Sequence, residues 1–406
     1  MKFSPSESSS PLLWRGTGGE VKLAIITTHP IQYNAPFFRM LAERKLVRVK
    51  VFYTWGESVL NNKYDPGFGK VVAWDIPLLN GYDHCFVKNI APDPGSHHFN
   101  GIDNPTLKKD IEQWGATALL VFGWKFKSHL NLLRHFKGKK TILFRGDSTL
   151  LDEIGGLSLK KILRQVFLKW IYRHVDKALY VGAANKEYYL KYGLKNAQLV
   201  FAPHAVDNGR FMKNDQFITR AEMGIPPRAI VFTFTGKFEI KKNPQLLLEV
   251  FRRLDDPDAH LLFVGSGKLE QTLKSTVEQL PVVLQSRIHF LPFQNQVKMP
   301  EIYRLGDVLV LPSRGPGETW GLAVNEAMAC SRAVLVSDKC GCAINLVVQG
   351  KNGYIFKSGD GDDLLEKMKM LLKDASRLPS MGQRSAKIIQ SFSFEKICIA
   401  IEQSLR

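Results

Sequence analysis

The feature that most constrains this chain is an alternation of strand-like and helix-like segments that runs through it twice. In the first half, apolar runs typical of buried strands, such as VKLAIITT (21–28) and TALLVF (117–122), alternate with amphipathic helical segments. After residue 208 the alternation starts again with AIVFTFTGKF (229–238) and HLLFVGSG (260–267). Strands joined through helices pair in parallel. The sequence therefore predicts an α/β protein with two Rossmann-like, doubly wound parallel sheets in series.

Chain length and linker composition set the domain boundaries that we expect. The chain has 406 residues, more than one hydrophobic core ordinarily holds. A polar segment broken by glycine and proline, HAVDNGRFMKNDQFITRAEMGIPPRA, separates the two halves. Two doubly wound sheets in series place a ligand cleft between them, at the carboxyl ends of their strands. The expected organisation is an N-terminal extension at 1–19, a first domain at 20–208, a second domain at 209–390 and a final helix at 391–406.

Composition limits the cellular locations and the classes of binding partner that we expect for this chain. Residues 1–19 are rich in Ser, Pro and Gly and lack the apolar core of a signal peptide, so we interpret them as a disordered tail or a start-site artefact. Apolar runs are far shorter than the ~20 residues that span a bilayer, and we expect a cytoplasmic location. The five cysteines form no C-x-x-C pair and are interpreted as free thiols. A net charge of +18 leaves nucleic acid, an anionic membrane surface and phosphorylated small molecules as candidate partners.

One glycine-rich segment, RGPGETWGLAVNEAMAC (314–330), follows the strand-like DVLVLPS (307–313), so we expect it at a strand's carboxyl end. Gly315 and Gly317 permit a tight turn, and a helix is expected to begin near Thr319. Free N–H groups in the first turn of a helix favour an anion such as a pyrophosphate. The amides that we expect to be free are those of Gly321, Leu322 and Ala323.

The two glutamates of this segment have two interpretations. In the functional one, Glu318 lies beside a sugar, and Glu326, two turns further along, lies beside a ribose. In the structural one, Glu318 only caps the helix and Glu326 is a solvated surface residue. Spacing alone favours neither.

Two other strand ends carry glycine and lysine. In TGKFEIKKN, Gly236 lets the chain turn, and Lys237 and Lys242 suit a diphosphate, although loop lysines are often only solvated. In VGSGKLE, the Gly-x-Gly turn that begins at Gly265 lacks the third glycine of a dinucleotide fingerprint and is weak evidence by itself.

Together these segments resemble the retaining glycosyltransferases of family 4, the group 1 glycosyltransferases, whose GT-B fold places two Rossmann-like domains around a cleft. GETWGLAVNEAMAC has that family's pattern of two glutamates separated by seven residues, with Trp320 where phenylalanine is usual. The resemblance covers about residues 180–406 well and the first half loosely. The final FSFEKICIAIEQSL is similar to the helix that returns to the first domain in that family.

The resemblance implies retaining transfer of a sugar from a UDP- or GDP-sugar to a glycan, lipid-linked or small-molecule acceptor, in the synthesis of cell-surface polysaccharide or glycoconjugate. It assigns Lys237 and Lys242 to the donor diphosphate, Glu326 to the ribose and Glu318 to the transferred sugar. No metal or other cofactor is implied, because lysines supply the positive charge and no Asp-x-Asp element is placed to hold a cation. The other donor-binding residues that it implies are Gly236, Gly265, Phe293 (near the base), Gly317, Thr319, Trp320, Gly321 and Leu322.

The first half departs from the family pattern. HPIQYNAPFF stands where many members have a glycine-rich loop after the first strand. We expect His29 to face the cleft; the alternative is a histidine that only hydrogen-bonds to nearby backbone. Arg145 and Asp147, in FRGDS, serve either the sugar or acceptor or a local salt bridge. The loop residues that we consider for acceptor contact are His97, His98, Asn104 and Trp124.

The helix-like segment LKKILRQVFLKWIYRHV (159–175) has one apolar face flanked by basic residues. One interpretation is a helix packed on the core with a basic outer surface. The other is a helix that docks on anionic lipid, which suits an enzyme with a lipid-linked acceptor. The apolar face consists of Leu159, Ile162, Leu163, Val166, Phe167, Trp170 and Ile171.

Two alternative functions are open on the sequence alone. Another GT-B enzyme, such as a sugar-nucleotide epimerase, would use the same cleft, but we cannot place its acid–base pair of carboxylate and histidine. A nucleic-acid-binding protein would explain the charge. The sequence shows no basic stripe interleaved with aromatic residues, so we expect no nucleic acid.

Overall fold

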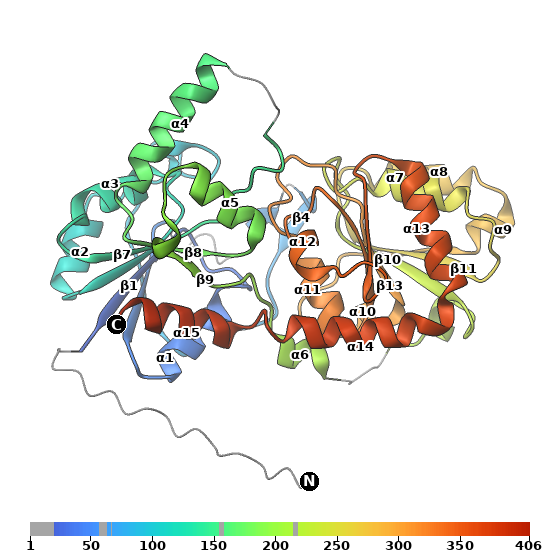
Figure 1. Ribbon diagram of the computed structural model, residues 1–406. Helices are drawn as coiled ribbons and strands as arrows, with labels where there is room; N and C mark the ends of the chain where they lie inside the picture. Colours follow the sequence, from blue (N-terminus) through green and yellow to red (C-terminus); the bar gives the residue numbers. More distant parts are fainter. Residues whose placement is uncertain (1–19, 57–62, 66, 154–157, 214–217) are drawn as a thin grey trace, which may run out of the picture.

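The computed structural model describes residues 20–56, 63–65, 67–153, 158–213 and 218–406. The extension expected at 1–19 lies outside these residues. The chain forms two lobes, each built around a parallel β-sheet covered by helices (Figure 1). The prediction of an α/β protein with two Rossmann-like, doubly wound sheets is confirmed.

Within the described residues, the first sheet has seven parallel strands in the order β5–β2–β1–β6–β7–β8–β9. Its central strands are buried on both faces, which is why they appear as continuous apolar runs in the sequence. The strands are β1 (Lys22–Thr27), β2 (Arg48–Tyr53), β5 (Asp83–Phe86), β6 (Ala118–Phe122), β7 (Thr141–Arg145), β8 (Lys177–Tyr180) and β9 (Leu199–Phe201). The helices are α1 (Ala35–Glu43), α2 (Leu107–Gln113), α3 (Lys127–Phe136), α4 (Leu159–Tyr172) and α5 (Ala183–Lys191).

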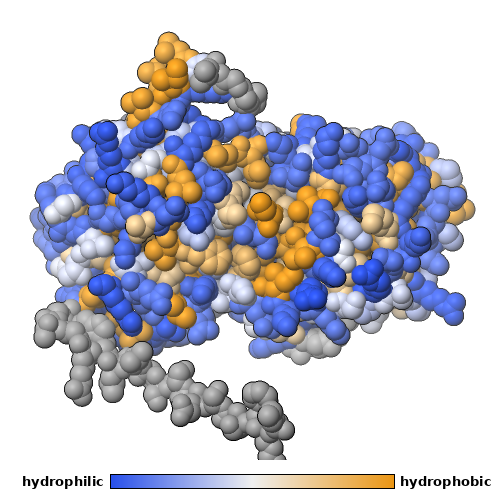
Figure 2. Space-filling model, viewed as in Figure 1, coloured by the Kyte–Doolittle hydropathy of each residue, from blue (hydrophilic) through white to orange (hydrophobic). Residues whose placement is uncertain are grey.

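Helix α4 stands out from the first lobe (Figure 1), and Figure 2 shows apolar surface along it. Its buried residues are Leu168, Ile171 and Tyr172, all in its C-terminal part. The interpretation of this helix as a core-packed helix therefore does not hold for its first nine residues.

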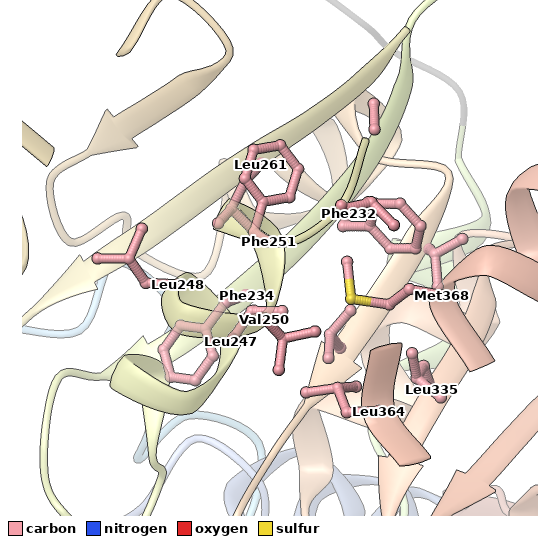
Figure 3. Close-up of a cluster of buried hydrophobic side chains, with 14 of the residues drawn as sticks. Phe232, Phe234, Leu247, Leu248, Val250, Phe251, Leu261, Leu335, Leu364 and Met368 are labelled. Atoms are coloured by element: carbon pink, nitrogen blue, oxygen red, sulfur yellow. The ribbon is translucent and has the colours of Figure 1, made fainter. Parts of the chain in front are cut away.

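Within the described residues, the second sheet has six parallel strands in the order β12–β11–β10–β13–β14–β15. Phe232 and Phe234 of its central strand share a buried cluster with Leu247 and Phe251 of the following helix (Figure 3). The strands are β10 (Ile230–Lys237), β11 (Ala259–Ser266), β12 (Ile288–Leu291), β13 (Val308–Leu311), β14 (Ala333–Ser337) and β15 (Gly353–Phe356). The helices are α6 (Asn208–Met212), α7 (Pro244–Arg252), α8 (Glu270–Glu278), α9 (Val282–Gln285), α10 (Met299–Leu305), α11 (Leu322–Ala329), α12 (Ala343–Leu346), α13 (Gly361–Lys373) and α14 (Leu378–Ile389).

The last helix, α15 (Phe394–Ser404), leaves the second lobe and packs against α1 of the first (Figure 1). Phe394 and Ile401 enter the core of the first lobe. The guanidinium of Arg44 at the end of α1 pairs with the Glu402 carboxylate, with Nε and Oε1 2.6 Å apart. The chain thus crosses between the lobes twice.

A short antiparallel hairpin, β3 (Lys63–Asp65) and β4 (Lys70–Val72), was not predicted from the sequence. It belongs to the first lobe but contacts the second. The carbonyl oxygen of Phe68 accepts a hydrogen bond from the Ser266 hydroxyl at 2.9 Å, and that of Ala73 accepts one from the Asn295 amide at 2.6 Å. The hairpin therefore closes one side of the space between the lobes.

Candidate active site

The two lobes enclose a cleft of about 1200 Å³ at the carboxyl ends of their strands. His29 and Trp55 line it just after β1 and β2. Gly236 and Gly265 line it at the ends of β10 and β11, and Phe293 follows β12. This edge is where doubly wound sheets bind ligands.

Gly236 and Gly265 pair with each other in adjacent strands of the cleft wall. Gly265 has a φ of +145°, and a Cβ built on it would lie 1.9 Å from the carbonyl oxygen of Gly236. A larger residue would have to move one of the two strands. The cleft wall is therefore bare backbone at this point.

Glu326 lies in the cleft wall and is almost completely buried, with 3% of its surface exposed. The Tyr303 hydroxyl donates to one carboxylate oxygen at 2.7 Å, and the hydroxyl of Tyr33, from the other lobe, donates to the second at 3.1 Å. Burial raises the pKa of Glu326, although the two tyrosine hydrogen bonds oppose the shift. The interpretation of Glu326 as a solvated surface residue is wrong.

Glu318 is buried behind the ammonium of Lys242, with which it forms an ion pair. The Ser313 hydroxyl donates to the same carboxylate oxygen at 3.0 Å. Among the described residues, Lys242 lines the cleft and Glu318 does not. Glu318 also does not cap α11, whose cap residue is Gly321. Glu318 therefore fixes the position of the Lys242 ammonium in the cleft.

Lys237 also lines the cleft, and its ammonium pairs with Asp65 of the hairpin at 2.9 and 3.0 Å. Burial alone would raise the pKa of Asp65, but hydrogen bonds from Lys237 and from the Phe68 and Gly67 amides lower it below its usual value. The first lobe thus supplies the counter-charge for this lysine.

Phe293 lies in an aromatic group formed by both lobes. Its ring centroid is 4.6 Å from that of Phe68 and 6.3 Å from that of Trp74. The Lys70 ammonium is 4.3 Å from the Phe293 centroid. Such a surface suits a planar ring such as a nucleobase.

Helix α11 begins at Leu322, three residues later than we expected. The turn extends through Gly321, whose φ of +106° continues a left-handed backbone that glycine adopts easily. Leu322 and Ala323, in the first turn, line the cleft. Their amides precede the first intrahelical hydrogen bonds, so an anion in the cleft can use them.

Three residues expected at the donor instead hold the lobes together, and among the described residues none of them lines the cleft. The Gly317 amide donates to Asp152 at 2.7 Å, and the Thr319 hydroxyl donates to Asp147 at 2.7 Å. The indole of Trp320 is buried, donates to Asn325 at 2.8 Å and packs against the His204 ring of the first lobe, with centroids 5.6 Å apart. The reason is that the turn before α11 faces the first lobe rather than the cleft.

Of the candidates in the first lobe, His29 lines the cleft, with its ring edge-on to Trp55 at 5.4 Å. Asp147 accepts from Thr319 and lies 3.8 Å from His204. Burial alone would raise the pKa of Asp147, but His204 and Thr319 lower it. Asp147 therefore serves the contact between the lobes.

Arg145, Asn104 and Trp124 are structural, which corrects the expectation that they contact sugar or acceptor. Arg145 is buried and donates to the carbonyl oxygens of Ala202 and Pro203, and burial lowers its pKa to about 10. The buried amide of Asn104 donates to main-chain carbonyl oxygens, and Trp124 packs edge-on against a ring of α4. Each of the three side chains hydrogen-bonds to main-chain groups of its own lobe or packs against a ring of that lobe.

One group of side chains could share a metal ion among the residues that the structure describes. Asp93, His97 and His98 have ligand atoms within 4.8 Å of one another, and all lie on one loop. His97 also lines the cleft. The chemistry proposed below uses the lysines and not this group.

Sequence reasoning missed Tyr33, Tyr303 and Asp65. Tyr33 lies 293 residues from its partner Glu326, and Asp65 lies 172 residues from Lys237. Tyr33 belongs to the HPIQY motif, which attracted notice only through His29. Nothing local marks Asp65 or Tyr303.

Two Rossmann-like domains facing a cleft define the GT-B fold, and solved glycosyltransferase structures share it with this chain. Anabaena Alr3699/HepE, solved in complex with UDP and glucose, superimposes with a TM-score of 0.68 over 95% of this chain and 99% of that chain, at 17% identity. WaaG, a glycosyltransferase involved in lipopolysaccharide biosynthesis, superimposes with a TM-score of 0.64 over 94% and 99% of the two chains, at 13% identity. At these identities the likeness is one of fold.

The second lobe carries the family relationship. A sequence model of the family described as glycosyl transferases group 1 matches residues 215–388. The D-inositol 3-phosphate glycosyltransferase of Rhodococcus jostii (strain RHA1) is 28% identical over 214 residues, which are 51% of this chain and 46% of that protein. The match thus spans about half the length of such a relative. These matches place residues 215–388 among the group 1 glycosyltransferases, as the sequence resemblance predicted for the second half of the chain.

Proposed function

We propose that this chain is a retaining glycosyltransferase of family 4. It transfers a sugar from a UDP- or GDP-sugar to a glycan, lipid-linked or small-molecule acceptor in the synthesis of cell-surface polysaccharide or glycoconjugate. The observation that supports this best is the convergence of Lys237 and Lys242 with bare glycine backbone in one cleft. The fold relative Alr3699/HepE is a protein solved with UDP and glucose.

The donor diphosphate lies between the two lysine ammoniums and the amides of Leu322 and Ala323. Lys242, held by Glu318, meets it in a fixed position. Lys237 exchanges its Asp65 partner for a phosphate oxygen. These groups stabilise the negative charge that grows on the diphosphate as the sugar departs. The lysines supply the cationic charge, so the proposal requires no metal or cofactor.

The ribose, the base and the transferred sugar of the donor bind other residues of the same cleft. Glu326, oriented by Tyr303 and Tyr33, accepts from the ribose hydroxyls. Phe293 and its aromatic neighbours cover the base. Glu318 orients the sugar indirectly, through the lysine it holds, which modifies the direct contact that the sequence resemblance implied.

The bond changes balance without a protein nucleophile. The bond from the sugar C1 to the diphosphate oxygen breaks, and its electron pair stays on that oxygen. The acceptor hydroxyl oxygen bonds to C1 on the face that the diphosphate leaves. Its proton passes to the departing diphosphate. Configuration is retained because the new bond forms on the face from which the old bond breaks.

A panel of UDP- and GDP-sugars tests the proposal. We expect one donor to raise the melting temperature and to be hydrolysed slowly, releasing the nucleoside diphosphate and a sugar that first appears with the donor's anomeric configuration. A donor converted to its epimer with no diphosphate released would instead identify an epimerase. Stabilisation by DNA and by none of the donors would contradict an enzyme of either kind.

A cytoplasmic location is part of the proposal. Across the ranges that the structure describes, every helix is too short or too polar to cross a bilayer.

A further inference from the structure

Helix α4 presents an apolar face that the residues described by the structure leave exposed. Five large apolar side chains within nine consecutive residues are exposed, by 73% (Leu159), 48% (Ile162), 61% (Leu163), 62% (Val166) and 43% (Phe167). They recur three and four residues apart, so they form one continuous face of the helix. Figure 2 shows this apolar surface on the arm that Figure 1 labels α4.

The helix is held firmly at its C-terminal end. Leu168 and Ile171 are buried in the core of the first lobe. The Phe167 ring stacks on Trp170 with centroids 5.8 Å apart, and Trp124 packs edge-on against Phe167 at 5.7 Å. The exposed face is therefore carried on a preformed helix and is not created by fraying.

A second set of contacts fixes the side of the helix that turns toward the protein. The Arg164 guanidinium donates to Glu153 at 2.7 Å and to the Tyr192 hydroxyl at 3.1 Å. At the N-terminal end, the Ser158 hydroxyl accepts from the Lys161 amide. The direction of the apolar face is thus set by the fold.

The charge of the helix is of one sign. Its sequence, LKKILRQVFLKWIY, contains four basic residues and no acidic residue. Lys160 and Lys161 lie next to the exposed leucines, and both are exposed. The whole chain has a net charge of +18. A second copy would bring the same cationic helix and the same net charge, so repulsion opposes self-association through this face.

We propose that α4 docks on an anionic lipid bilayer. It lies in the plane of the surface, with the five apolar side chains among the headgroups and acyl chains and the lysines against lipid phosphates. The inference stands without the proposed transfer activity, since it rests on exposure and charge.

Vesicle flotation of the purified full chain, without any donor, tests the proposal. We expect the chain to float with vesicles of mixed phosphatidylcholine and phosphatidylglycerol and not with pure phosphatidylcholine, and binding to fall as salt is raised. The paired change Lys160→Glu and Lys161→Glu should lower binding on the order of tenfold or more. The paired change Leu163→Ser and Val166→Ser should lower it comparably, because it removes the inserted side chains.

Two matched control variants distinguish docking through α4 from a general effect of positive charge or of exposed apolar side chains elsewhere on the protein. Lys108→Glu with Lys109→Glu changes adjacent lysines on α2 of the same lobe, and Val282→Ser with Val283→Ser changes residues of α9 that are 78% and 72% exposed. The valine pair should bind vesicles as the wild type does, and the α2 pair should lose much less than the α4 pair.

A spectroscopic variant does not depend on loss of binding. In Leu163→Trp, the added indole should shift its emission to the blue with the mixed vesicles and not with pure phosphatidylcholine. No shift, or equal loss in the α2 and α4 lysine pairs, would overturn the proposal. Concentration-dependent dimers that Leu163→Ser with Val166→Ser abolishes in the absence of lipid would also overturn it. Because no donor is present, any of these three outcomes would leave the proposed transfer activity untouched.

Discussion

The two lysines of the cleft stand five residues apart, Lys237 at the end of β10 and Lys242 in the loop before α7, yet they are held in different ways. Lys242 pairs with Glu318 of its own lobe, and 17% and 8% of the two side chains are exposed. Lys237 pairs with Asp65 of the other lobe, and 32% and 30% of those side chains are exposed. The first pair survives any separation of the lobes, whereas the second requires the hairpin to lie against the second lobe. One cation is therefore fixed in place, and the other can exchange its partner.

Removing the fixed cation should have one of the two largest effects on activity. We expect Lys242→Ala to cost on the order of 2–4 kcal/mol of transition-state stabilisation, roughly 30- to 1000-fold in kcat/KM, because the leaving charge loses its nearest partner. Lys268→Ala, on an exposed loop outside the cleft lining, is the matched control and should keep full activity. Turnover of Lys242→Ala close to that of the wild type would remove this lysine from the site.

Glu326 tests the donor wall away from the diphosphate. We expect Glu326→Ala to cost on the order of 2–4 kcal/mol as well, since the ribose loses a charged acceptor that two tyrosines hold in place. Steady-state kinetics over a range of donor concentrations measures it. If Glu326→Ala and the wild type gave the same kcat/KM, the ribose assignment would be wrong.

Glu326 and Asp65 should change the stability of the protein in opposite directions as the pH is varied. Burial raises the folded-state pKa of Glu326 above 4.5, so its contribution to stability is complete below pH 4.5 and is lost as the pH rises through the raised pKa. The pKa of Asp65 is lowered, so its contribution is lost as the pH falls. Melting temperatures against pH should therefore rise in Glu326→Gln relative to the wild type on the alkaline side of this window. A Glu326→Gln curve parallel to that of the wild type would contradict the buried carboxylate.

The smallest effect, and one of opposite direction, is expected for the exchangeable pair. Asp65→Asn should free Lys237 for the donor and tighten nucleoside diphosphate binding by about 1 kcal/mol or less, because a partly exposed ion pair is weak. Calorimetric titration with UDP and GDP measures the change. Weaker binding in Asp65→Asn would show that Asp65 supports the donor instead of competing with it.

The residues predicted from the sequence and those missed differ in how far apart their partners lie along the chain. Gly236, Lys237 and Gly265 lie at strand ends and Lys242 lies just after one, so the alternation of strands and helices already placed them at one edge of a sheet. Asp65 acts across the two lobes, and its contact depends on how the domains are set against each other, which no local pattern encodes.

Two local errors have physical causes. Helix α11 begins at Leu322 because Gly321 extends the turn in a left-handed conformation. The sequence alone predicted a helix start near Thr319, because the residue types there are also compatible with the beginning of a helix. The apolar periodicity of α4 predicted a helix correctly. Periodicity identifies which residues share one face of a helix, but it does not show whether that face is buried against the protein or exposed. The exposure of Leu159 and Val166 is visible only in the structure.

The most direct test of whether the two lysines bind the donor's leaving group compares the affinities of the protein for a nucleoside monophosphate and for the corresponding diphosphate. Titration of the wild type with UMP and UDP, and with GMP and GDP, should show one diphosphate binding more tightly than its monophosphate. In the double variant Lys237→Ala and Lys242→Ala that advantage should disappear while monophosphate binding persists. Equal affinities in the wild type, or an advantage that the double variant keeps, would contradict the account.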